Sequence, residues 1–390
     1  MMLHILVVDD NADLVDAMRT KVESAVRSRA KVTTLTGDVL KKAIRELRGR
    51  ESNWDAKGRW SPRQYNAHFD SADILVLDYR LADLYGPDGY MTGEDLAALA
   101  RRYSTAGPIV SVNRFGEQSF DLRLRPETQT WAEVSVAHED LRNPRLWSAG
   151  ADGPYRPWGW SSLEHLPELF YRRMKHALRH FDSPVAKSLG ISQTQLDLMP
   201  RKISESLGDD PFRMTFREVA RQRAFPSDNV PKPSRPQMAR VAAAEVGKWL
   251  SHSVLPGQEI LIDAPHLAAQ YPSLVKGRRT QARLNHLARM TPGADLPLDT
   301  TRIKGARLRP GFWLDRPAWW TEAVLENREL PENRRPWERT PLDYRFAEDT
   351  SQFHTPGECQ AFQAVGMFGE RYVYVPDGTI IYKPANRLLG

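Results

Sequence analysis

Three carboxylates stand at the ends of two apolar runs of this chain. The run "ILVVDD" at residues 5–10 ends in Asp9 and Asp10, and "DILVLD" at 73–78 ends in Asp78. Both runs have the composition of buried strands. Because sites in open parallel sheets form where the strands end, we expect the three acids to converge at one edge. Carboxylates held that close repel each other, which shifts their pKa values or recruits a cation.

Oxygen ligands of this kind suit a hard divalent cation, and Mg²⁺ is the expected one. A magnesium site suits phosphate chemistry, because charge on a transferring phosphoryl group needs to be neutralised. A carboxylate in such a site can itself be the nucleophile that accepts the phosphoryl group. A simpler interpretation is also open, in which Asp10 or Asn11 only caps the helix that begins near residue 12.

Apolar strands alternate with amphipathic helices through the first part of the chain, which predicts an α/β fold with helices on both faces of a parallel sheet. We expect a first domain at 1–141, with an insertion at about 51–72. Residues 142–183, rich in Trp and Pro and then helical, are predicted as a connector. Residues 184–390 are predicted as an uncharacterised mixed α+β effector domain, in which 316–330, "RPAWWTEAVLENREL", is expected to be a helix.

The pair "ILVVDDN" and "DILVLDYRL" resembles the receiver domain of two-component response regulators. The resemblance implies a flavodoxin-like, doubly wound parallel sheet and a phosphorelay role in the cytoplasm. It implies that Asp9, Asp10 and Asp78 hold Mg²⁺ together with the backbone carbonyl of Arg80. It also implies that Asp78 accepts a phosphoryl group from a histidine kinase or a phosphotransfer protein.

The sequence departs from the receiver pattern at the residues that would sense the phosphoryl group. Asn113 stands where the family has Thr or Ser, and Ser111 lies two residues earlier on the same face of the strand. No lysine occurs between Lys57 and Lys175, so His138 is the nearest substitute for the lysine of the family. The first domain is therefore expected to be an atypical receiver, with Asn113, Ser111 and His138 as candidate phosphate contacts.

Two stretches of the second half could contact DNA. The stretch "AKSLGISQTQL" has the spacing of a helix-turn-helix, whose base-facing side chains would be Ser192, Gln193 and Gln195. The stretch "KGRRTQAR" supplies candidate phosphate contacts at Lys276, Arg278, Arg279 and Arg283, and "RIKGARLR" at 302–309 follows it. An ordinary helical hairpin and a solvated helix face are the simpler interpretations of the two stretches.

Composition limits the remaining classes of function. The 390 residues carry a formal net charge of +6, and the basic excess lies in residues 184–390, which permits an anionic partner. A single cysteine, Cys359, excludes an internal disulfide framework. No apolar run is long enough to span a bilayer and no signal peptide is recognised, so we expect a cytoplasmic protein without membrane contact.

Enzymatic motifs are sparse. Asp263 and His266 lie three residues apart but lack a recognisable nucleophile, and there is no phosphate-binding glycine loop. The favoured expectation is an effector that is not an enzyme, with a hydrolase in the second half left open as an alternative, and we predict no oligomeric state. Three functions stay open: a phosphorylated signalling protein, a DNA-binding transcriptional regulator acting through the second half, and a non-switching phosphate-sink or protein-interaction module.

Overall fold

The computed structural model describes residues 2–52, 66–81, 84–85, 90–113, 130–151, 157–208, 210, 212–225, 233–289, 295–334, 342–362 and 370–376. The chain divides into two compact units. Unit 1 comprises Met1–Asp152, Ser162–Val185 and Arg213–Lys248, and unit 2 comprises Gly153–Ser161, Ala186–Phe212 and Trp249–Gly390. Most of the insertion expected at about 51–72 lies outside the described residues.

Unit 1 is built on a five-stranded, all-parallel sheet with the strand order β2-β1-β3-β4-β5. This order is that of flavodoxin-like folds, so the predicted fold class is confirmed. The strands are β1 Leu3–Val8, β2 Ala30–Leu35, β3 Ile74–Asp78, β4 Ile109–Asn113 and β5 Val134–Ala137. All of β3 is buried, as expected for a strand covered on both faces.

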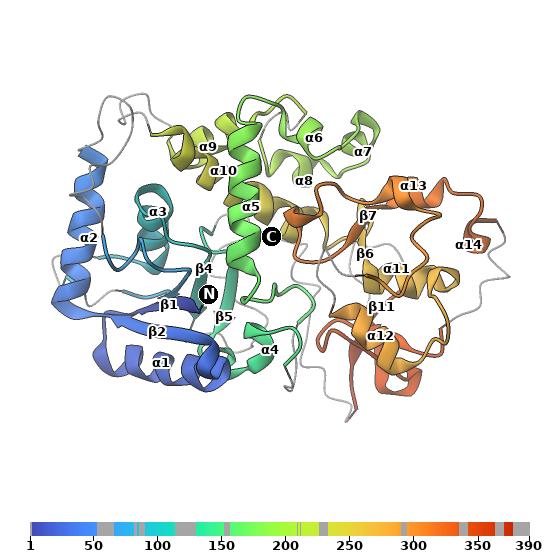
Figure 1. Ribbon diagram of the computed structural model, residues 1–390, viewed down its shortest axis with the longest axis horizontal. Helices are drawn as coiled ribbons and strands as arrows, with labels where there is room; N and C mark the ends of the chain where they lie inside the picture. The colour runs from blue at the N-terminus through green and yellow to red at the C-terminus, as the bar shows by residue number, and fades with distance from the viewer. Residues whose placement is uncertain are drawn as a thin grey trace. The chain divides into compact units, whose positions relative to one another are not determined.

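Helices cover both faces of this sheet (Figure 1). Helix α1, Ala12–Val26, packs against β1 and β2, whereas α3, Gly93–Tyr103, packs against β3 and β4 and contacts α2, Gly37–Ser52. The inner face of α1 carries Val15, Met18 and Val22 at helical spacing, and all three are buried. The short helix α4, Pro144–Trp147, lies on the α1 side.

Helices from later in the chain complete unit 1. Helix α10, Arg235–Lys248, packs against α5, Leu166–Arg179, against α9, Phe216–Ala224, and against α3. Its buried face is mostly alanine and valine, which allows close helix packing. Residues from the ranges predicted as connector and effector therefore belong to the same compact unit as the parallel sheet.

Unit 2 combines small sheets with short helices, as predicted for a mixed α+β domain. Its four-stranded sheet has the order β10-β11-β8-β9, and β6 pairs antiparallel with β7. The segment predicted as a helix at 316–330 begins instead as strand β7, so that prediction is wrong at its start.

The strands and helices of unit 2 have the following bounds: β6 Leu261–Asp263, β7 Ala318–Trp320, β8 Arg345–Ala347, β9 Gln352–His354, β10 Cys359–Phe362, β11 Arg371–Tyr374, α7 Gln193–Asp197, α8 Arg201–Glu205, a π-helix at Trp249–Val254, α11 Ala264–Gln270, α12 Gln281–Ala288, α13 Thr321–Leu325 and α14 Pro331–Arg334.

Helix α6, Val185–Ser188, lies where the chain passes from one unit to the other. Within the described ranges, every helix is too short or too polar to cross a membrane.

Candidate functional site

The register of the parallel sheet brings two of the three predicted acids side by side. Val8 of β1 is paired with Leu77 of β3, so the next residues along, Asp9 and Asp78, are neighbours where the strands end. Both side chains are buried, with exposed fractions of 0% and 1%. Asp10 follows directly and is half-buried. Two buried carboxylates side by side at the carboxyl edge of a parallel sheet mark this edge as a candidate site.

Local hydrogen bonds orient these acids. The backbone N–H of Asn11 donates to Asp9 Oδ1 at 2.9 Å, and the backbone N–H of Arg80 donates to Asp78 Oδ2 at 3.1 Å. Asn11 itself caps α1, because its side-chain oxygen accepts from the backbone N–H groups of the first turn. The capping role considered for Asp10 or Asn11 thus belongs to Asn11. Asp9, Asp10 and Asp78 each make further interactions beyond these bonds.

The start of α3 fits closely against the residues that follow Asp78. The backbone N–H of Gly93 donates to the carbonyl of Tyr79 at 2.7 Å, and a Cβ on Gly93 would lie only 2.2 Å from the carbonyl oxygen of Asp78. Thr92 and Asp95 form a capping box at this helix start. Arg80, whose side chain is exposed, pairs with Thr92 in an isolated β-bridge. The backbone that would supply the Arg80 carbonyl is therefore held by α3.

The candidate phosphate contacts occupy different levels of the sheet. Val112 is the registered partner of Asp78, so Asn113 ends β4 one residue beyond it, at the carboxyl edge. Ser111 is registered with Leu77, one level below Asp78 and inside the strand. Asn113 is buried and Ser111 half-buried. The sheet thus places Asn113 nearer than Ser111 to a group bound at the edge.

His138 follows β5 and is engaged by α1. Lys21 Nζ lies 2.8 Å from His138 Nδ1, and the same ammonium forms an ion pair with Glu139. Lys21 is nine residues beyond Ala12, which is about 13 Å along a helix that starts at the acidic edge. A phosphate contact from His138 would have to replace the Lys21 interaction. Lys21 itself was missed in the sequence because it belongs to another element.

Oxygen donors at this edge match the preference of Mg²⁺, which commonly uses one or two carboxylates and keeps several waters. Asp9 and Asp78 supply two buried carboxylates, and Asp10 and the Arg80 carbonyl are adjacent in the chain. Across the described part of the chain, no group of three or more His, Cys, Asp or Glu side chains is arranged to hold a metal ion. The donors therefore fit a magnesium site built on two carboxylates.

The candidate DNA contacts of the second half lie in two environments. Ser192 and Gln195 form a capping box at the start of the five-residue helix α7, and Gln195 is buried. The side-chain amide of Gln193 donates to Asp197 Oδ1 at 2.8 Å. In contrast, Lys276, Arg278 and Arg283 are exposed and Arg279 is half-buried.

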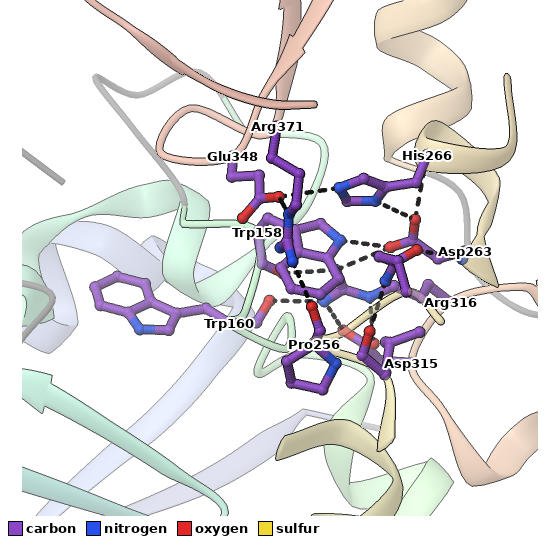
Figure 2. A network of polar contacts seen from close by, with 11 residues as sticks. Trp158, Trp160, Pro256, Asp263, His266, Asp315, Arg316, Glu348 and Arg371 are labelled. Carbon is purple, nitrogen blue, oxygen red and sulfur yellow. Dashed lines mark hydrogen bonds and ion pairs between the residues drawn. The ribbon is translucent and has the colours of Figure 1, made fainter. Parts of the chain in front are cut away.

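A second cluster of ionisable groups is buried in unit 2, around His266 of α11 (Figure 2). His266 Nδ1 lies 2.6 Å from Asp263 Oδ1, and His266 Nε2 lies 3.0 Å from Glu348 Oε1. Asp263 ends β6 and also caps α11. The exposed fraction is 7% for His266 and 0% for both acids. The imidazole thus bridges two buried carboxylates.

Two arginines complete the network. Arg371 of β11 pairs with Glu348 and donates to the carbonyl of Pro256. Arg316 lies 3.7 Å from Asp263 Oδ2 and 2.8 Å from Asp315 Oδ1, and the indole N–H of Trp158 donates to Asp263.

Burial lowers the pKa of His266, but attraction and hydrogen bonding to Asp263 and Glu348 outweigh it and raise the pKa above its usual value. Burial raises the pKa values of both acids, and their cationic neighbours reverse this and lower them. We interpret the network as an imidazolium and two arginines balancing three carboxylates, those of Asp263, Asp315 and Glu348. Both ring nitrogens of His266 face carboxylates. We therefore interpret the cluster as one that holds α11 against β6 and β8 rather than one that activates a nucleophile.

Of the comparisons with known proteins, only the comparison with solved structures gave a match. No family model and no curated protein matches this chain. Among solved structures, the RcsB response regulator of Salmonella typhimurium, described in a study of its conformational dynamism for DNA interaction, aligns over 54% of this chain and 96% of its own. The identity is 15% and the TM-score 0.23. The fold of unit 1 is accordingly assigned from its own strand order, and it is of the kind that response regulators have.

Proposed function

We propose that this chain is a signalling protein of the response-regulator kind, in which Asp78 accepts a phosphoryl group. The observation that supports this is the adjacency of Asp9 and Asp78, both buried, where parallel strands β1 and β3 end. Both acids lie at the carboxyl edge of the parallel sheet, which is the edge where such folds bind ligands, and this position favours a function.

In the proposed reaction, an Oδ atom of Asp78 attacks the phosphorus of a phosphohistidine or of acetyl phosphate. A new P–O bond forms, the bond from phosphorus to the donor breaks, and the donor leaves with the electron pair. Asp9 and Asp78 would hold Mg²⁺ with the Arg80 carbonyl, beside Asp10, and the bound ion would neutralise charge on the transferring group. The backbone N–H of Arg80, which already donates to Asp78 Oδ2, orients the nucleophile.

The response to phosphorylation is proposed to differ from that of a standard receiver. Asn113 can donate a hydrogen bond to a phosphoryl oxygen through its amide, but it offers no hydroxyl. His138 is bonded to Lys21 rather than free to follow the phosphoryl group. These two departures favour a second candidate as well, a non-switching module that takes up phosphoryl groups without transmitting a change.

Acetyl-phosphate labelling of the full chain tests the phosphoacceptor. With Mg²⁺ present, we expect one phosphoryl group per chain with the acid and alkali lability of an acyl phosphate, lost in Asp78→Asn and strongly reduced in Asp9→Asn. Asp13→Asn removes an exposed carboxylate on α1 and serves as the matched control, with labelling equal to the wild type. Labelling that persists in a folded Asp78→Asn chain would refute the assignment of this site.

A further inference from the structure

One segment of unit 2 carries more than the whole basic excess of the chain. Residues 276–309 contain nine Lys or Arg and two Asp, an excess of seven positive charges. The formal net charge of all 390 residues is +6, so the rest of the chain is slightly acidic. A concentration of one sign over so short a stretch is unusual for a solvated surface, where both signs are normally interspersed.

These cations come from two segments of the chain that lie side by side. Val275 and Leu298 form an antiparallel bridge, and the backbone N–H of Lys276 donates to the carbonyl of Pro297 at 3.0 Å. Asp299 N–H donates in turn to the carbonyl of Leu274 at 2.6 Å. The loop before α12 is thereby fixed beside the turn that begins at residue 299. We call the resulting surface the basic patch; it comprises Lys276, Arg278, Arg279, Arg283, Arg302 and Lys304.

A glycine turn brings one arginine of α12 back toward the loop. Gly277 has φ +71°, and a Cβ placed on it would lie 3.4 Å from Arg283 Nη1. The guanidinium of Arg283 therefore lies next to the backbone between Lys276 and Arg278. This conformation is natural for glycine and strained for other residues. The charge density of the basic patch thus depends on a specific backbone conformation.

The patch is poorly neutralised. Arg302 pairs with Asp299 at 3.6 Å, and a hydrogen bond from Thr301, followed by Arg302 and Lys276, lowers the pKa of Asp299. Within the described ranges, the other five members of the patch form no ion pair with a carboxylate. Asp295 is the second acid of the segment, and it is exposed. Five of the six patch members are exposed, and Asp299 offsets only part of their charge, through Arg302 and Lys276.

We propose that the basic patch binds the phosphodiester backbone of a nucleic-acid duplex. Regularly spaced phosphates neutralise several cations at once and release counterions. Single-strand binders add aromatic platforms for unpaired bases, and membrane binders add apolar side chains. None of the large hydrophobic side chains that are exposed in the described residues lies between 274 and 309. These features favour sequence-independent contact with duplex phosphates over both alternatives.

Fluorescence anisotropy of a labelled random-sequence DNA duplex, titrated with the full chain at several salt concentrations, tests this proposal. Each phosphate contact contributes about 0.9 to the slope of log K against log salt. The triple variant Lys276→Gln, Arg278→Gln, Arg283→Gln should lower that slope by about 2.7 and weaken binding by about 10²- to 10³-fold near 0.1 M salt. The same titration with an RNA duplex of equal length shows whether the basic patch binds DNA or RNA more tightly.

The matched control is Lys31→Gln, Lys42→Gln, Arg45→Gln, which removes the same charge from exposed positions of unit 1. It should leave duplex binding unchanged. Equal weakening by the two triple variants, or no weakening by the patch variant, would overturn the proposal. So would tighter binding to a single strand, or patch-dependent binding to phosphatidylserine vesicles without binding to duplexes.

Discussion

Replacing His266 by Gln should loosen the part of unit 2 that surrounds α11. The imidazole bridges Asp263 and Glu348 at 2.6 and 3.0 Å inside a network that is almost fully buried. Removing one member of a buried ion pair costs about 3–5 kcal/mol. Each acid keeps an arginine here, Arg316 or Arg371, so the lower end applies. We expect about 3 kcal/mol, or about a hundredfold, in the local opening equilibrium.

Amide hydrogen exchange of the full chain, resolved by peptide, measures this opening. Exchange should accelerate in the peptides that contain α11 and β8 and stay unchanged in unit 1. His286→Gln is the matched control, because His286 is exposed on α12. Equal protection of α11 in both variants would refute the assignment of His266 as a buried bridging cation.

The same network makes a prediction about pH. The pKa of His266 is raised in the folded chain above its usual 6.5, so its contribution is fully present below that pH. The contribution is lost as pH rises through the folded-state pKa, because neutral imidazole cannot donate to both carboxylates. After correction for intrinsic exchange, protection of α11 should fall at alkaline pH in the wild type and vary less in His266→Gln. A flat wild-type profile would contradict this reasoning.

Three further predictions concern unit 1. Gly93→Ala should destabilise the start of α3 and reduce labelling of Asp78, because its Cβ would meet the Asp78 carbonyl at 2.2 Å; thermal unfolding and labelling check this. Asn113→Ala should reduce phosphoryl labelling more than Ser111→Ala does, and equal labelling by the two variants would exclude Asn113 as a phosphate contact. Burial, and then repulsion from neighbouring cations including His180, lowers the pKa of His176 to about 4, so an NMR titration should show neutral imidazole at pH 6.5. Its contribution to stability is present above pH 6.5 and is lost as pH falls toward about 4, whereas a midpoint near 6.5 would contradict the burial of this ring.

The sequence predicted what local patterns determine. Unbroken apolar runs identified β1 and β3, and their terminal acids follow from the rule that sites form where parallel strands end. The sheet order then placed Asp9 beside Asp78 without any further assumption. The mixed nature of the second half was also predicted, because its apolar segments are short and vary in period.

Features that depend on distant partners could not be predicted. His266 and Glu348 are 82 positions apart, and Lys21 and His138 are 117 apart. Trp319 lies in a strand because it pairs with Ile262, although the local sequence favours a helix. Tertiary pairing overrides local propensity in such segments. The contribution of α10 to unit 1 likewise depends on its contacts with α3 and α5.

Borohydride trapping tests the central claim most directly. Borohydride reduces an aspartyl phosphate to homoserine, which leaves a permanent mass change at the residue that carried the phosphoryl group. After acetyl phosphate and Mg²⁺ treatment, peptide mass spectrometry should find this change at Asp78 and nowhere else along the chain. Reduction at another acid, or an unmodified Asp78 in a chain that carries label, would contradict the proposal that the buried acids at the ends of β1 and β3 form a phosphoacceptor site.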